Sequence, residues 1–144
     1  MTTASIKNTL SKKTHNPVYR PSRKNLLGTG STLLNLACSG KEYGGWPKGK
    51  YVFLVGDSTS GKTWLSLTCF AEASASSAFD DYRFIYDNGE DGALMDLGRF
   101  FGKKAAARIE PPKKKSTGEP VFSETVEDFY FNLTDALKGP RPVI

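Results

Sequence analysis

The sequence is poor in the residues that build metal sites. Its 144 residues include two cysteines, Cys38 and Cys69, and a single histidine, His15. These three residues stand apart without metal-ligand spacing, so the sequence offers no zinc site. We expect both thiols to be reduced.

Long hydrophobic runs are also absent. No apolar stretch approaches the roughly 18 residues that a bilayer-spanning helix needs. Lys7, Lys12 and Lys13 lie near the N-terminus, but the apolar segment of a signal peptide does not follow them. With 38% hydrophobic and 24% charged residues, the composition is that of a globular chain. We therefore expect a cytoplasmic protein of one domain, with no membrane partner.

Acidic residues are scarce in the first third of the chain. Residues 1–50 hold nine Lys or Arg and a single acid, Glu42, whereas residues 51–100 hold three basic and eight acidic residues. Residues 1–24 show no periodicity, which predicts a basic, disordered tail before a domain over residues 25–144. Such a tail is suited to contact nucleic acid phosphates; the alternative is a solvated tail without a partner.

One stretch carries a recognisable chemical pattern. It fits G-x-x-x-x-G-K-S/T, a loop whose backbone N–H groups converge on a nucleotide phosphate. Lys62 is placed to reach the β- and γ-phosphates, and the Thr63 hydroxyl to ligate Mg²⁺. The predicted binding residues are Gly56, Asp57, Ser58, Thr59, Ser60, Gly61, Lys62 and Thr63.

The segments on either side of this loop agree with the pattern. Residues 51–55 form an apolar run rich in β-branched and aromatic residues, which predicts a buried parallel strand. Residues 62–75 lack Gly and Pro and carry apolar residues at helical spacing, so the phosphate would lie at a helix N-terminus. Residues 82–86 predict a second strand, and a right-handed crossover would bring the acids after it beside the loop.

The remaining chain predicts further helices. A short helix follows Ser31 and ends after Cys38, and residues 44–49 form a turn. Residues 93–101 and 103–109 predict a helix or a pair broken at Gly102, and residues 111–120 a surface loop. A last helix begins after Ser123 or Thr125, with one face packed on a sheet. Residues 143–144 begin another strand, so we expect the N-terminal part of a longer protein or a truncated reading frame.

Two further motifs precede the phosphate loop. They are Leu27-Gly28-Thr29-Gly30-Ser31-x-x-Leu34-Asn35-x-Ala37 and Gly44-Gly45-Trp46-Pro47-Lys48-Gly49. Followed by the strand, loop and helix, they resemble the RecA-like recombinase ATPases, especially their phage-encoded relatives. The resemblance covers roughly residues 26–144. It implies an α/β fold, a RecA-like P-loop NTPase core with parallel strands and flanking helices, truncated before the Walker B strand.

The resemblance also implies a function. It implies that ATP and Mg²⁺ bind at Lys62 and Thr63, and that Glu90 is the catalytic glutamate, with Asp87 and Asp91 as weaker candidates. For the full-length parent it implies DNA-dependent ATP hydrolysis in recombination, repair or replication. The implied partners are single-stranded DNA and further copies of the chain, assembled into a filament or ring. The chain departs from the family at Asn35, where many relatives have Asp, and in a longer spacing between the second strand and the glutamate. The Walker B aspartate would fall beyond residue 144.

Other functions remain open at this point. A phosphate-loop kinase for a nucleoside or small metabolite fits the loop, but it needs a lid with arginines. A ring-helicase motor and a circadian-type regulatory ATPase share the N-terminal pattern. The non-enzymatic alternative is a truncated nucleotide-binding or interaction module without catalysis.

Overall fold

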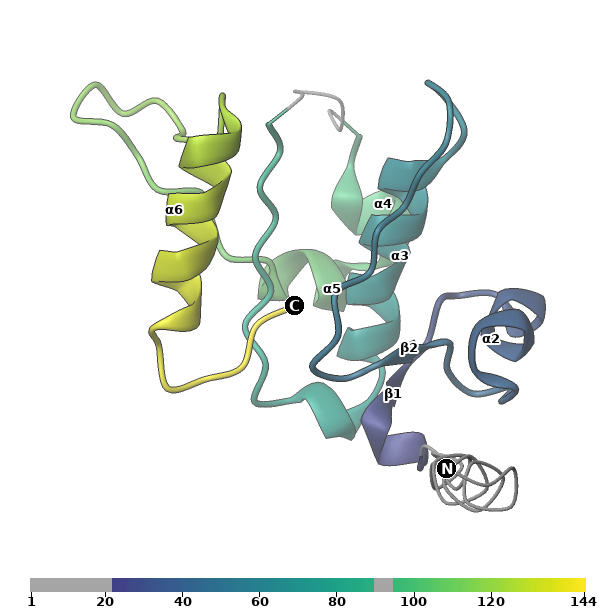
Figure 1. The fold of residues 1–144 in the computed structure, drawn as a ribbon. Helices are drawn as coiled ribbons and strands as arrows, with labels where there is room; N and C mark the ends of the chain where they lie inside the picture. Colours follow the sequence, from purple (N-terminus) through teal and green to yellow (C-terminus); the bar gives the residue numbers. More distant parts are fainter. Residues whose placement is uncertain (1–21, 90–94) are drawn as a thin grey trace, which may run out of the picture.

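The computed structural model describes residues 22–89 and 95–144. Most of the tail predicted over residues 1–24 therefore lies outside the described residues. Within these ranges, no helix combines the length and apolar character that crossing a membrane requires. The elements in chain order are η1 (Arg23–Asn25), β1 (Leu26–Leu27), α2 (Thr32–Ser39), β2 (Trp46–Pro47), α3 (Lys62–Ser74), η2 (Ser77–Phe79), α4 (Leu97–Phe101), α5 (Lys103–Arg108) and α6 (Val126–Leu137) (Figure 1).

Helix α3 lies at the centre of the molecule and carries the core. Its start at Lys62 confirms the predicted helix after the phosphate loop. Phe70 on its buried face stacks on Phe84, with ring centroids 5.3 Å apart, and Phe79 of η2 closes the same cluster. This apolar face explains why a helix of 13 residues is stable here, since tertiary packing supplies most of a helix's stability in proteins.

Helix α2 is defined by its caps, and its prediction is confirmed. The Ser31 side chain accepts a hydrogen bond from the Leu34 N–H, and Gly40 ends the helix in the left-handed conformation with φ of 69°. Buried Asn35 accepts hydrogen bonds from both the N–H and the hydroxyl of Thr29 through Oδ1, and donates through Nδ2 to the Glu42 carbonyl. The asparagine thus holds the segments before and after α2 together.

The predicted turn over residues 44–49 contains a short strand. In β2, Trp46 and Pro47 pair antiparallel with Leu27 and Leu26 of β1, respectively. The Lys48 N–H extends this pairing by donating to the Asn25 carbonyl at 2.9 Å. The resulting ribbon lies between α2 and α3 (Figure 1).

The predicted fold class is wrong. The only sheet among residues 22–89 and 95–144 is the two-stranded antiparallel β1–β2, and a RecA-like core of parallel strands is not present there. Residues 51–55 form no strand, and the predicted second strand retains only isolated parallel bridges, which pair Arg83 with Val143 and Phe84 with Ile109. A strand requires a hydrogen-bonded neighbour, and no described segment lies in that position beside residues 51–55.

Helices α4 and α5 confirm the predicted pair broken at Gly102, whose φ is 89°. Asp96 caps α4 by accepting from the Arg99 N–H, while residues 93 and 94 of the predicted helix lie outside the described residues. Both helices pack on α3. Trp64 of α3 takes part in this packing, because its ring centroid lies 4.8 Å from that of Phe101 of α4.

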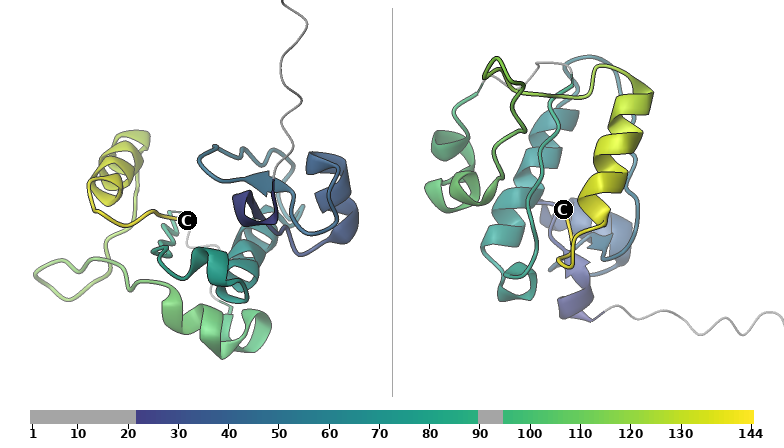
Figure 2. Two further views of the ribbon diagram at one scale, coloured as in Figure 1. Left: turned by 90° about the horizontal axis from the view of Figure 1, so that it is seen from below. Right: turned by 90° about the vertical axis from the view of Figure 1, so that its left-hand side faces the viewer.

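Helix α6 begins as predicted but does not pack as predicted. Thr125 and Asp128 form a complete capping box, which confirms the predicted start. None of the residues of α6 is buried, so the predicted packing of one face on a sheet is wrong. The helix stands at one side of the molecule (Figures 1 and 2) and is held by polar contacts, such as the one from Arg83 Nη1 to the Ala136 carbonyl at 3.2 Å.

Candidate nucleotide-binding site

The predicted phosphate loop forms a tight turn before α3. The Ser60 N–H donates to the Asp57 carbonyl at 3.2 Å. A Cβ atom at Gly56 would lie 2.7 Å from the Ser60 hydroxyl, so a side chain there would crowd the turn. Thr59 and Gly61 both have positive φ, 65° and 87°. For Gly61 this conformation costs little, because glycine has no Cβ to clash.

The loop delivers its backbone to the N-terminus of α3. The first N–H groups of a helix have no partner within the helix, and the helix dipole places partial positive charge there. The intrahelical hydrogen bonds begin with the Leu65 N–H, which donates to the Gly61 carbonyl at 2.9 Å. The amides of the first turn therefore face the loop as anion donors.

Lys62 folds back over the loop. Its Nζ donates hydrogen bonds to the carbonyls of Gly56 and Asp57, each at 2.8 Å. The ammonium group is thereby held across the turn at the start of α3. Because both carbonyls belong to an exposed loop, an anion that approaches the turn can take over the ammonium group's donors at small cost.

Thr63 fits the role of a shared Mg²⁺ ligand. Its half-buried side chain forms no hydrogen bond with residues 22–89 or 95–144, so the hydroxyl is available. In the same ranges, no group of three or more His, Cys, Asp or Glu residues is arranged to hold a metal ion. A Mg²⁺ ion at Thr63 would thus depend on phosphate oxygens and water for its other ligands, which is its usual coordination in nucleotide sites.

The predicted carboxylates do not reach the loop in the described part of the chain. Asp87 instead accepts a hydrogen bond from the Ser123 N–H at 2.9 Å and another from the Ser123 hydroxyl. Asn132 Nδ2 of α6 donates to the same hydroxyl at 3.0 Å. Glu90 and Asp91 lie outside the described residues. The sequence analysis missed the contact between Asp87 and Ser123, because 36 residues separate the two and no local pattern marks such a pair.

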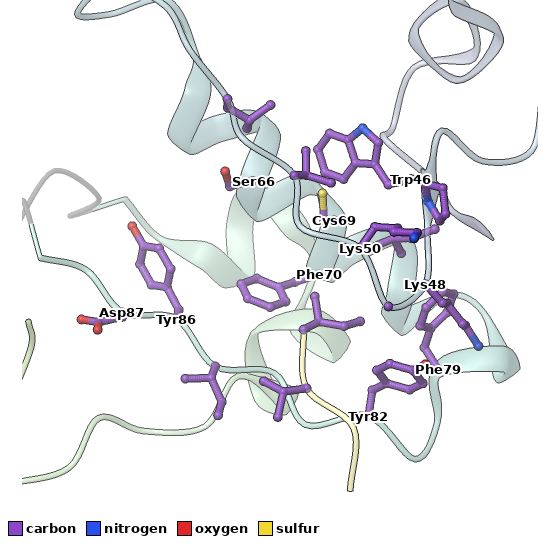
Figure 3. Close-up of a pocket in the computed structure, with 18 residues that line it drawn as sticks. Trp46, Lys48, Lys50, Ser66, Cys69, Phe70, Phe79, Tyr82, Tyr86 and Asp87 are labelled. Carbon is purple, nitrogen blue, oxygen red and sulfur yellow. The ribbon is translucent and has the colours of Figure 1, made fainter. Parts of the chain in front are cut away.

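A groove runs beside α3, distinct from the loop. It encloses about 520 Å³, and none of residues 56–63 lines it. Val52 and Leu54 line one side of it and residues 85–87 the other, and Cys69 and Phe70 of α3 line it between them (Figure 3). Burial, reinforced by the charge of Glu72, raises the pKa of the Cys69 thiol to about 12. The thiol is therefore protonated and unreactive at neutral pH.

Comparison with known proteins adds no assignment. No protein-family model, curated protein or solved structure matches this chain. The functional argument therefore depends on the residues of the loop and on their geometry.

Proposed function

We propose that this chain binds Mg²⁺-ATP through residues 56–63. The observation that carries the proposal is the position of Lys62, which starts a 13-residue helix and lies across a glycine-bounded turn. One short loop thus brings together the Lys62 ammonium group, the N-terminus of α3 and the backbone amides of its first turn. This combination suits a polyphosphate better than a single carboxylate, because successive phosphates each find donors.

Each residue of the loop has a specific part in this binding. Lys62 exchanges its two carbonyl acceptors for oxygens of the β- and γ-phosphates, a stronger, charge-assisted interaction. Gly61 keeps the turn open for the phosphates and directs the first amides of α3 toward them. Thr63 offers its hydroxyl to Mg²⁺, which supplies charge neutralisation between the β- and γ-phosphates when bound.

We propose that the described residues bind Mg²⁺-ATP, and we do not assign ATP hydrolysis to them. No carboxylate from outside the loop forms a hydrogen bond or an ion pair with residues 56–63 within the described ranges. Asp87 is engaged by Ser123. Hydrolysis needs a group that orients the attacking water, and Glu90 is the residue we propose for it.

Calorimetric titration of Mg²⁺-ATP into the purified chain tests the binding. We expect the Lys62→Ala variant to lose measurable binding while its helix content by circular dichroism stays unchanged. Lys50→Ala is the control, since it removes an exposed lysine that lies ahead of the loop. Equal ATP affinity of the Lys62→Ala variant and the parent chain would overturn the proposal.

A second assay separates binding from hydrolysis. We expect the Glu90→Gln variant to bind Mg²⁺-ATP as tightly as the parent chain. If the parent chain releases phosphate from ATP, the variant should release it at least about a hundredfold more slowly, the scale of a lost general base. Turnover that is unchanged in the variant would remove Glu90 from the catalytic role and leave the binding site intact.

A further inference from the structure

Three aromatic side chains gather beside the end of α3 that carries the phosphate loop, where α4 lies alongside (Figure 1). Trp64 of α3 meets Phe100 of α4 edge-on, with ring centroids 5.4 Å apart and an angle of 71° between the rings, and it also packs against Phe101. Trp64 remains 46% exposed and Phe100 49%. The cluster therefore holds α4 against α3 and still presents aromatic surface to solvent.

Trp64 belongs to the first turn of α3, two residues after Lys62. At a rise of about 1.5 Å per residue, the two Cα atoms are about 3 Å apart along the helix axis. The Cα–Cβ bonds of a helix tilt toward its N-terminus, so that of Trp64 is directed toward the loop. The Trp64 N–H forms no backbone hydrogen bond in the described part of the chain, because the intrahelical bonds begin with Leu65. One residue thus offers an amide to the phosphates and an aromatic ring beside them.

The charged groups beside the cluster suit an anionic ligand. The Arg99 Cζ atom lies 5.7 Å from the Phe100 ring centroid, and this guanidinium forms no ion pair within residues 22–89 and 95–144. Two exposed lysines begin α5. Asp96, which precedes α4, accepts the capping hydrogen bond from the Arg99 N–H. Glu90 and Asp91 come earlier in the chain and lie outside the described residues.

The base of a nucleotide is the group that suits this surface. A sugar joins the base to the phosphates, so a nucleotide held at residues 56–63 carries a planar aromatic group close to the first turn of α3. Aromatic side chains stack on any base, because every base has a π-face. A guanidinium group beside the rings adds a cation–π contribution. The cluster thus supplies a contact for the part of the nucleotide that the phosphate loop does not bind.

We propose that Trp64 and Phe100 form the surface on which the base of the bound nucleotide stacks, with Arg99 beside it. Such stacking rests on the proposed binding of Mg²⁺-ATP at residues 56–63, because the phosphates bring the base to this surface. Trp64 supplies the stacking ring, and the edge contact from Phe100 fixes the orientation of that ring. Stacking does not read the hydrogen-bonding groups of a base. The site therefore selects nucleoside triphosphates over inorganic tripolyphosphate and accepts ATP and GTP with similar affinities.

Calorimetric titration with two ligands tests the stacking. Mg²⁺-ATP carries a base and Mg²⁺-tripolyphosphate carries none, so the comparison isolates the contribution of the base. We expect the parent chain to bind ATP more tightly than tripolyphosphate. The Trp64→Leu variant should bind ATP about five- to hundredfold more weakly, the scale of one lost base–aromatic contact. Its affinity for tripolyphosphate should not change, since Lys62 and the first amides of α3 are retained.

Two further variants separate stacking from packing. Leucine at position 64 keeps an apolar side chain against Phe101, and Trp64→Phe restores an aromatic ring as well, so the phenylalanine variant should recover most of the ATP affinity. Phe129→Leu is the matched control, because Phe129 of α6 is an aromatic residue with the same exposed fraction of 46%. It should bind both ligands as the parent does.

Fluorescence reports the contact directly. Trp46→Phe leaves Trp64 as the one tryptophan of the chain. We expect saturating Mg²⁺-ATP and Mg²⁺-GTP to change its emission, because the base covers the ring, and Mg²⁺-tripolyphosphate to leave the emission as it was. An equal change with all three ligands would show that the ring responds to the phosphates alone and would overturn base stacking.

The outcomes distinguish this surface from the phosphate site. Equal affinity of the parent chain for Mg²⁺-ATP and Mg²⁺-tripolyphosphate, or unchanged ATP affinity in Trp64→Leu, would overturn base stacking and leave phosphate binding at Lys62 intact. An equal loss of both ligands in Trp64→Leu would also overturn it, since Trp64 would then only support the fold. A parent chain that binds neither ligand would overturn the proposed function and base stacking together.

Discussion

Arg83 and Glu110 meet side by side in a two-point ion pair. Arg83 Nε donates to Glu110 Oε1 at 2.8 Å, and Nη2 donates to Oε2 at 2.7 Å. The same guanidinium donates through Nη1 to the Ala136 carbonyl near the end of α6. One side chain therefore joins the chain after η2, the segment after α5 and the last helix.

This pair predicts a pH-dependent stability. The hydrogen bonds from Arg83 lower the pKa of Glu110 below its ordinary value. The stabilisation is therefore complete above the ordinary glutamate pKa of about 4.3 and is lost as the pH falls through the lowered folded value. Because the carboxylate side chain is 37% exposed, we expect Glu110→Gln to cost only about 0.5–1 kcal/mol at pH 7. Urea unfolding at pH 7 and pH 2.5 measures the difference, which should be smaller at the lower pH, where protonation of Glu110 is favoured.

Lys48 predicts a second contribution to stability. Its ammonium group donates to the Ala78 carbonyl at 2.8 Å and lies 4.3 Å from the Phe79 ring centroid. We expect Lys48→Met to lower the free energy of unfolding by about 1–2 kcal/mol, through loss of the cation–π contact and the hydrogen bond. Lys50→Met, two residues away and exposed, should change it by less than about 0.5 kcal/mol. Equal effects in urea unfolding would show that the ring contacts contribute nothing.

The two glycines Gly49 and Gly61 allow stability and binding to be separated. Both have positive φ, 69° and 87°, and in both cases a Cβ would meet no atom within 4 Å. We expect either change to alanine to destabilise the chain by about 1 kcal/mol, since the cost is conformational alone. Only Gly61→Ala should also weaken Mg²⁺-ATP binding in calorimetry. Equal ATP affinity of the two variants would contradict a role for the Gly61 turn.

The two thiols should differ in reactivity. Cys69 is buried, and its raised pKa of about 12 leaves roughly one thiol in ten thousand ionised at pH 8. Cys38 is exposed on α2. We expect Ellman's reagent to modify one thiol per chain rapidly and the second only after unfolding in urea. The Cys38→Ser variant should show no rapid phase; a rapid phase in that variant would mean that the core around Cys69 opens.

Local signals predicted the helices well, as α6 illustrates. Thr125 and Asp128 are three residues apart and satisfy each other's backbone groups, so the helix start follows from the sequence alone. The packing of α6 could not be predicted in this way. Its apolar residues predicted a covered face, but Phe129 and Tyr130 are 46% and 63% exposed, because the sheet that was to cover them is not formed by the described residues.

The candidate site also combines features that local sequence predicts with features that depend on distant contacts. The loop over residues 56–63 and the helix start at Lys62 depend on contacts within a few residues, such as Lys62 with Gly56, and the sequence determined them by itself. Only the tertiary structure decided that residues 51–55 find no strand neighbour among the described residues and that Asp87 turns to Ser123 instead of the loop. Strand pairing and such distant hydrogen bonds join segments tens of residues apart, so they depend on which segments meet in space. Caps, turns and helical periodicity act within about four residues, which is why they can be read directly along the chain.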